Sequence, residues 1–318
     1  MTVTAETTTR QWSRRRSLTR ARIARGSVPY LLLLPVVVVL GAILGYPIYM
    51  VFRLSTQHYT LFELIRHHGT WVGLHNFGSV LHDQVFWHTA LRTIVFTIVN
   101  VGLTMLLGVG LALLFVRVST WVRILLTAGL VLVWAMPPVV AVQVFNWMIN
   151  PQNGIVNYAL TKAHAGDYFQ HDWMGSTTSQ LGWVTILIVW GALPFVAITV
   201  YAALSQVPNE LIEAAEIDGA RSWRVFKDVT VPIIRPVLLI LTSLSILWDF
   251  GVFTQAYLLI GQPHIQPSNY LMSIYLFEEG YFKSDYGRGA AISLLMLVMV
   301  AAMSVVYVRR MIRIGEVE

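Results

Sequence analysis

Cysteine is absent from this chain of 318 residues, and charged residues are scarce, at 12% of the sequence. The lack of cysteine excludes disulfide frameworks, thiolate metal sites and cysteine nucleophiles. Soluble domains usually carry about 25% charged residues, so this chain is poorly equipped to cover a water-facing surface. Hydrophobic residues make up 56% of the sequence and the mean hydropathy is +0.64, which indicates a membrane protein.

Motifs for nucleotide binding and for hydrolysis are also missing. No G-x-x-x-x-G-K-[ST] phosphate-binding loop occurs, and none of the lysines (Lys162, Lys227 and Lys283) follows a glycine. The sequence contains no H-E-x-x-H or G-x-S-x-G motif, and no nucleophile or metal cluster lies within its apolar segments. We therefore expect no catalytic residue, no metal site and no cofactor in this chain.

Long apolar stretches are abundant. A helix needs about 20 apolar residues to cross the hydrocarbon core of a bilayer. The stretches that qualify are 28–52, 91–116, 124–148, 183–204, 237–260 and 289–308, and Trp248-Asp249-Phe250 interrupts the fifth. Pro137-Pro138 and Pro194 interrupt the third and fourth stretches, either as breaks that face a cavity or as packing kinks. The sequence predicts an all-α integral membrane protein with six transmembrane helices.

The distribution of basic residues predicts the orientation. With a cytoplasmic N-terminus, 16 of the 22 Lys and Arg residues fall on the cytoplasmic side, where such residues are usually in excess. Both termini are then cytoplasmic. The formal charge of +6 would suggest nucleic-acid binding in a soluble protein, but here we expect the basic residues to set the orientation in the lipid bilayer, and we expect no nucleic-acid partner. Arg14-Arg15-Arg16 looks like a twin-arginine export signal, but the apolar run that follows is too long and has no cleavage site. The nine histidines fall in predicted outer loops or at the start of the second span, where polar loop composition is favoured over a metal or pH-sensing site.

The predicted cytoplasmic connection 208–232 reads as two short helices. Pro208 suits a first helical turn, and Gly219 can take the left-handed conformation that ends a helix. Ser222 can cap a second helix, and Pro232 would stop or redirect the chain.

This connection also contains Leu211, Trp223 and Phe226, apolar residues that need a cover. The cover could be the protein's own span ends or a soluble partner, and the residues alone leave both open.

The same connection resembles a known motif. Glu213-Ala214-Ala215, then Gly219, then Val229-x-Val231-Pro232 is similar to the EAA motif of permeases in binding-protein-dependent ATP-binding-cassette importers. The family usually has Ile and Leu where this chain has Val229 and Val231.

Other stretches resemble the first permease subunit of carbohydrate-type importers. They are Tyr46-Pro47, Gly73-Leu74-x-Asn76-Phe77, Phe86-Trp87-x-x-x-Leu91, Gly154-Ile155-Val156-Asn157 and Asp218-Gly219-Ala220-x-x-Trp223-x-x-Phe226. This resemblance covers the chain from about residue 27 onward.

The resemblance implies a type I importer permease in a bacterial plasma membrane. It implies a basic cytoplasmic tail over 1–26 and a permease domain over 27–318, with core 88–308 and coupling loop 208–232. The implied partners are a second permease, a pair of ATPase subunits that bind ATP and Mg²⁺, and an extracytoplasmic solute-binding protein. The implied ATPase-coupling residues are Glu213, Ala214, Ala215, Gly219, Trp223 and Phe226.

Asp249 is the candidate for the solute path, because a carboxylate within a span is costly and is often functional. On one continuous helix, Asp249, Phe253 and Tyr257 would share a face beside Trp248, which suits a polyol or sugar. Pairing of Asp249 with a neighbouring helix is the alternative. The chain departs from the family at Asp249-Phe250-Gly251 and at Gly261-Gln262-Pro263. A non-sugar solute such as a polyol phosphate, or a secondary transporter, remains the alternative function.

Overall fold

A computed structural model of the protein describes residues 32–261 and 264–316, and the basic tail with its arginine triplet lies outside them. The apolar helices in this described part are Leu32–Ser55, Gln84–Arg117, Thr177–Leu204, Ser222–Phe250 and Tyr286–Arg310, together with a bent pair, Thr120–Trp134 and Pro138–Met148. Each corresponds to one of the six predicted stretches. The prediction of an all-α protein with up to six spans is confirmed.

The chain divides into two compact units, one up to Leu54 and the other from Ser55 onward. In the first unit, a wide π-helical turn η1 (Gly41–Gly45) leads into α2 (Tyr46–Ser55). The turn precedes Pro47, whose ring would clash with the carbonyl four residues earlier in a regular helix, and the wider turn relieves that crowding.

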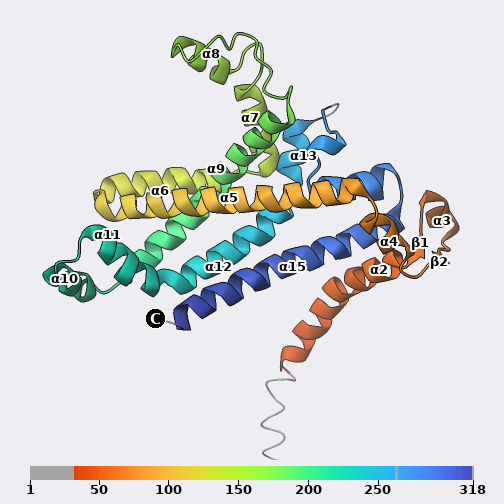
Figure 1. The fold of residues 1–318 in the computed structure, drawn as a ribbon, viewed down its shortest axis with the longest axis horizontal. Helices are drawn as coiled ribbons and strands as arrows, with labels where there is room; N and C mark the ends of the chain where they lie inside the picture. Colours follow the sequence, from red (N-terminus) through yellow and green to blue (C-terminus); the bar gives the residue numbers. More distant parts are fainter. Residues whose placement is uncertain (1–31, 262–263, 317–318) are drawn as a thin grey trace, which may run out of the picture. The chain divides into compact units, whose positions relative to one another are not determined.

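The second unit is built on four long helices, α5 (Gln84–Arg117), α9 (Thr177–Leu204), α12 (Val231–Phe250) and α15 (Tyr286–Glu316). Figure 1 shows α12 running alongside α5 and α15. The first turn of α9 and the third turn of α5 are joined to the same connection: Asn269 donates to Gln180 at 2.6 Å, and Arg92 donates to the Tyr270 carbonyl at 2.8 Å. Helices α5 and α9 therefore begin at the same end of this unit.

Shorter elements connect these helices. They are β1 (Gln57–His58), α3 (Leu61–Arg66), β2 (Thr70–Trp71), α4 (His75–Leu81), α6 (Thr120–Trp134), α7 (Pro138–Met148), α8 (Ile155–Lys162), α10 (Asn209–Ile217), α11 (Ser222–Arg224), η2 (Val225–Thr230), α13 (Thr254–Ile260), η3 (Pro267–Asn269), α14 (Met272–Phe277) and η4 (Glu278–Phe282). Strands β1 and β2 pair antiparallel, with Gln57 opposite Trp71.

Two predicted spans differ from straight helices. The chain bends by 100° between α6 and α7, since the consecutive prolines Pro137 and Pro138 cannot continue the helical hydrogen bonds. The stretch 237–260, predicted as one span with an interruption at Trp248-Asp249-Phe250, forms two helices: α12 ends at Phe250, and α13 begins only at Thr254. Pro194, by contrast, lies within an unbroken α9.

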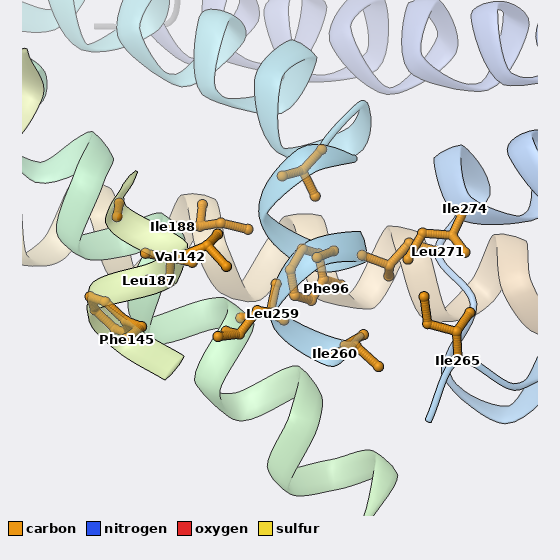
Figure 2. Close-up of a cluster of buried hydrophobic side chains, with 14 of the residues drawn as sticks. Phe96, Val142, Phe145, Leu187, Ile188, Leu259, Ile260, Ile265, Leu271 and Ile274 are labelled. Carbon is orange, nitrogen blue, oxygen red and sulfur yellow. The ribbon is translucent and has the colours of Figure 1, made fainter. Parts of the chain in front are cut away.

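The largest buried apolar cluster lies where α5, α7, α9, α13 and α14 meet (Figure 2). Phe96 of α5 lies among Val142 of α7, Leu187 of α9 and Ile274 of α14. This cluster holds the broken segments α7 and α13 against the long helices, whereas Pro137, Pro138 and Gly251 at the breaks themselves are exposed.

Close packing of α5 on α9 depends on Gly108. A Cβ at this position would lie 2.5 Å from Cγ1 and 2.9 Å from Cβ of Val196, so the two helices approach without room for a side chain. We expect Gly108→Ala to lower the free energy of unfolding by about 1–3 kcal/mol. Gly110→Ala on the same helix has nothing within 4 Å and is the matched control. Thermal unfolding in detergent checks this expectation, and equal melting temperatures for the two variants would contradict it.

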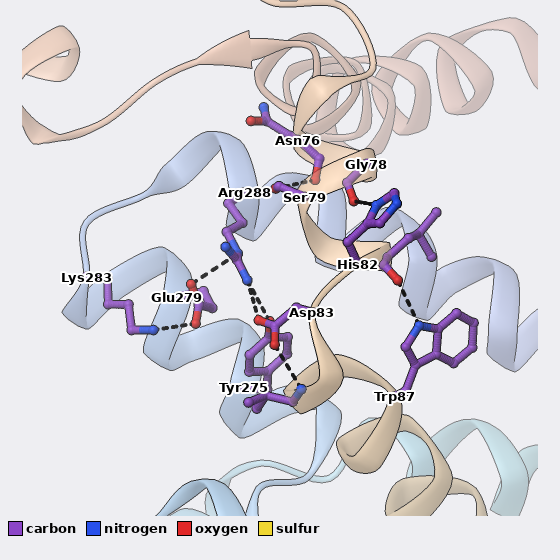
Figure 3. Close-up of polar contacts among 12 residues, drawn as sticks. Asn76, Gly78, Ser79, His82, Asp83, Trp87, Tyr275, Glu279, Lys283 and Arg288 are labelled. Atoms are coloured by element: carbon purple, nitrogen blue, oxygen red, sulfur yellow. Dashed lines mark hydrogen bonds and ion pairs between the residues drawn. The ribbon is translucent and has the colours of Figure 1, made fainter.

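A polar cluster joins the start of α5 to the start of α15 (Figure 3). Arg288 forms ion pairs with Asp83 at 2.5 Å and with Glu279 at 3.2 Å, and Tyr275 donates to Asp83 at 2.9 Å. Burial alone would raise the pKa of Asp83, but the hydrogen bonds from the Val85 N–H and Tyr275 and the charge of Arg288 outweigh it and lower this pKa. Burial also raises the pKa of Tyr275 to about 12, which keeps its hydroxyl a neutral donor.

Candidate functional site

The segment predicted to couple to an ATPase folds as a helix, a sharp turn and a second, longer helix. Helix α10 ends at Ile217, and the chain turns at Gly219, where φ is +82°, in the left-handed region. The Ala220 N–H donates to the Ala215 carbonyl at 2.9 Å and the Gly219 N–H to the Glu216 carbonyl at 3.0 Å. This pair of bonds is a Schellman motif, which confirms the predicted helix end at Gly219.

The second helix differs from its prediction. Arg221, and not Ser222, occupies the N-cap position, and no side chain caps the helix. The chain then continues through the π-helical turn η2 into α12, so Pro232 does not stop the helix. The wide turn before Pro232 accommodates its ring. The prediction of two short helices is therefore wrong for the second one.

An exposed apolar surface results, which we call the coupling surface (Leu211, Ile217 and Trp223). Ile217 is 85% exposed and Trp223 70% exposed, and Leu211 is also exposed. Ile212 packs inward against the cluster at the ends of α5, α9 and α12. Among the described residues, the protein's own span ends therefore cover only the inner face of this segment.

The predicted coupling residues lie around this surface. Glu213 and Ala214 are exposed on α10, Ala215 is half-buried, and Gly219 lies at the exposed turn. Phe226 is half-buried, and its ring centroid is 5.7 Å from that of Trp223.

A cavity of about 280 Å³ lies where the broken helices meet the middle of α9. Its wall comes from the break between α6 and α7, from α9, and from the end of α12 with the start of α13. Aromatic rings form much of this wall: Trp134 stacks on Phe195 at a centroid distance of 6.2 Å, and Phe195 contacts Trp248 at 5.5 Å. We call it the central cavity.

Asp249 lies in the wall of the central cavity, on the last turn of α12. It is only 5% exposed, and its Oδ2 has no hydrogen-bond partner in the described part of the chain. A buried carboxylate oxygen without a partner is costly, so such an atom indicates a place where a ligand or water binds. No described residue of a neighbouring helix pairs with this oxygen.

Of the other residues predicted to line the solute path, one lies in the wall of the central cavity and two lie outside it. Trp248 shares the wall of the central cavity with Asp249. Phe253 and Tyr257 do not line it; their rings stack on each other at 5.0 Å and contact Phe277. The expected common helical face does not form, because α12 ends between Asp249 and Phe253.

One polar feature was missed in the sequence. Helix α5 buries a row of polar side chains on one face, Thr89, Thr93, Thr97, Asn100 and Thr104. The Oγ1 atoms of Thr97 and Thr104 have no described partner, whereas the Asn100 amide donates to the Phe96 carbonyl at 2.8 Å. Their spacing of three and four residues is visible in the sequence and could have revealed this face.

Within the described residues, no three His, Asp or Glu side chains come together as a metal-binding group.

Apolar spans, broken helices around a cavity and an exposed loop surface together define a multi-span membrane permease. Residues 104–312 match the family described as binding-protein-dependent transport system inner membrane component. The chain belongs to this family, as its EAA-like motif predicts, and is a multi-pass inner-membrane protein.

Named relatives are similar over most of their length. The chain is 39% identical to the diacetylchitobiose uptake system permease protein DasB of Streptomyces coelicolor, covering 94% of this chain and 92% of that protein. It is 31% identical to the trehalose/maltose transport system permease protein MalF of Thermococcus litoralis, covering 88% of this chain and 92% of that protein.

The fold is also found in a solved structure. A bacterial ABC transporter involved in the import of the acidic polysaccharide alginate contains a chain that matches with a TM-score of 0.77 and 19% identity. The match covers 93% of this chain and 99% of that one. This likeness confirms the type I permease fold.

Proposed function

We propose that this chain is the permease subunit of an ATP-driven importer and forms half of the translocation path for a neutral sugar or oligosaccharide. A second permease would complete the path. Two separate ATPase subunits would bind ATP and Mg²⁺, and an extracytoplasmic solute-binding protein would deliver the sugar. The names of the diacetylchitobiose and trehalose/maltose relatives support the sugar as solute class.

The observation that carries the ATPase partnership is the coupling surface. Large exposed apolar side chains on a short segment mark an interaction site. Glu213 lies beside them and supplies a charge for a polar contact, as the EAA resemblance implies. A soluble ATPase domain fits this surface, because the chain has no phosphate-binding loop of its own.

Basic residues support a cytoplasmic position for this end of the molecule. Arg221, Arg224 and Lys227 lie on the segment that carries the coupling surface. Arg117 lies at the end of α5, and α5 packs in the same apolar cluster as Ile212 of that segment. Such an excess is typical of the cytoplasmic side, so we place both termini there.

Trp223→Ala tests the coupling surface directly. We expect co-purification with the ATPase subunit to weaken at least tenfold, because exposed aromatic anchors contribute about 2 kcal/mol or more to interfaces. The melting temperature of the permease should not change, since Trp223 is 70% exposed. Trp121→Ala is the matched control, because Trp121 is 79% exposed at the first turn of α6 and lies outside the coupling segment. Equal retention of the ATPase by both variants would contradict the assignment.

The function itself is tested by reconstitution. The chain, its second permease and its ATPase are placed in liposomes with the solute-binding protein, and uptake of labelled diacetylchitobiose, maltose and trehalose is measured. We expect ATP-dependent uptake of at least one of these sugars. Uptake by the permease alone on an ion gradient would instead identify a secondary transporter.

A further inference from the structure

A second hollow lies away from the central cavity, at the end of α7 and in the segment of chain that connects α7 to α9. It has a volume of about 340 Å³ and is formed by the end of α7, the turn before α8, α8 itself and the connection that follows. We call it the α8 pocket. Figure 1 shows α8 beyond the end of α7, next to the connection that leads into α9.

Aromatic rings of the α8 pocket are exposed on the surface of the chain. Trp147, Tyr158 and Phe169 all line it and are all exposed, Phe169 to 77%. Rings as exposed as these contribute little to the core of the chain, because little of their surface is buried in it. They are available to a ligand with apolar faces.

Polar groups between these rings are uncharged. Gln152, Asn153 and Gln170 contribute side-chain amides, and Thr161 contributes a hydroxyl. Amides and hydroxyls both donate and accept hydrogen bonds. No Asp, Glu, Lys or Arg lines the pocket, and the nearby cation, Lys162 Nζ, lies 5.9 Å from the ring centroid of Tyr158.

Internal contacts hold the wall of the pocket in shape. Asn150 Oδ1 accepts from the N–H groups of Gln152 and Asn153 at 2.9 and 3.0 Å. Asn157 donates to the His171 carbonyl at 3.0 Å and accepts from Trp173 Nε1 at 2.6 Å, which ties α8 to the following connection. Preorganised walls reduce the entropy cost of binding.

We propose that the α8 pocket binds a neutral sugar unit, held between Trp147, Tyr158 and Phe169 and hydrogen-bonded by the amides beside them. The C–H faces of a pyranose ring are apolar and pack on aromatic rings, while its hydroxyls match amide groups. The occupant is the soluble sugar that the importer carries, so this inference rests on the proposed function. The pocket is separate from the central cavity, with which it shares no lining residue.

Saturation-transfer NMR on the purified chain tests this site. The chain is placed in phospholipid nanodiscs free of maltoside detergent, whose head group would compete, and maltose and diacetylchitobiose are titrated. We expect saturation transfer to at least one sugar, and Phe169→Ala to weaken its binding about tenfold. Trp71→Ala, an aromatic residue that is 72% exposed on β2 and lies outside the pocket, should bind as wild type does.

Several outcomes would overturn the site. The first is that neither sugar receives saturation transfer from the protein. The second is that Phe169→Ala binds the sugar with the affinity of the wild type. The third is that Asp249→Asn loses sugar binding while Phe169→Ala keeps it. Fluorescence quenching by dibrominated lipid is compared between the wild type and Trp147→Phe, and the part that is lost in the variant belongs to Trp147. Quenching of Trp147 would show that lipid, and not sugar, occupies the pocket. Uptake assays separate this inference from the proposed function: ATP-driven sugar import with no binding at the α8 pocket refutes the pocket alone.

Discussion

Gly219→Pro is expected to abolish both co-purification with the ATPase subunit and ATP-dependent uptake. Proline fixes φ near −65°, whereas Gly219 has φ of +82°. Proline also removes the N–H that donates to the Glu216 carbonyl at 3.0 Å. The Schellman turn then cannot form, and α10 is redirected away from η2, against which it packs. Because the coupling surface is built from both helices of this segment, we expect its shape to be lost.

Gly219→Asn is the matched control. Asparagine tolerates the left-handed region better than most residues, and a Cβ at Gly219 would meet nothing within 4 Å. We expect this variant to keep most of the uptake and to co-purify with the ATPase. If Gly219→Pro assembles and transports as wild type does, α10 is not the contact that we propose.

Asp249→Asn is expected to reduce uptake roughly ten- to hundredfold while assembly and basal ATPase activity persist. A hydrogen bond to a charged group contributes about 1.5–3 kcal/mol, which corresponds to this range of rates. The Asp249 Oδ2 atom has no described partner and lies in the wall of the central cavity, so its loss removes a ligand contact and no internal one. Asparagine keeps the volume of the side chain.

Ser245→Ala serves as the control for Asp249. Ser245 is buried on α12 one turn before Asp249 and does not line the central cavity. Its substitution should leave the rate of uptake within about twofold of wild type, because a change outside the path does not alter ligand contacts. Wild-type uptake in Asp249→Asn would remove Asp249 from the solute path.

The number and approximate positions of the spans followed from the sequence, because hydropathy summed over about 20 residues is a local property. The turn at Gly219 was also predictable, since a glycine after an amphipathic helix has few other roles. The EAA-like spacing from Glu213 to Pro232 indicated the family, which the match over 104–312 confirms.

Tertiary packing decided where the helices break and what the breaks enclose. The consecutive prolines predicted an interruption, but the bend of 100° depends on how α7 packs in the cluster with α9 and α13. The sequence marks the fifth stretch as interrupted at Trp248-Asp249-Phe250, and Gly251 follows, but only the structure shows that α12 ends at Phe250 and so separates Asp249 from Phe253 and Tyr257. The exposure of Trp223 likewise could not be predicted, since hydropathy does not tell a surface ring from a buried one.

The sequence by itself therefore determined the class of protein, its spans and the position of the EAA-like loop that we propose contacts an ATPase, all of which depend on residues close together in the chain. Only the tertiary structure placed Asp249 in a cavity with Trp134 and Phe195 and gathered Trp147, Tyr158 and Phe169 around the α8 pocket. Both sites join residues from separate elements, and the packing of the whole chain sets their distances.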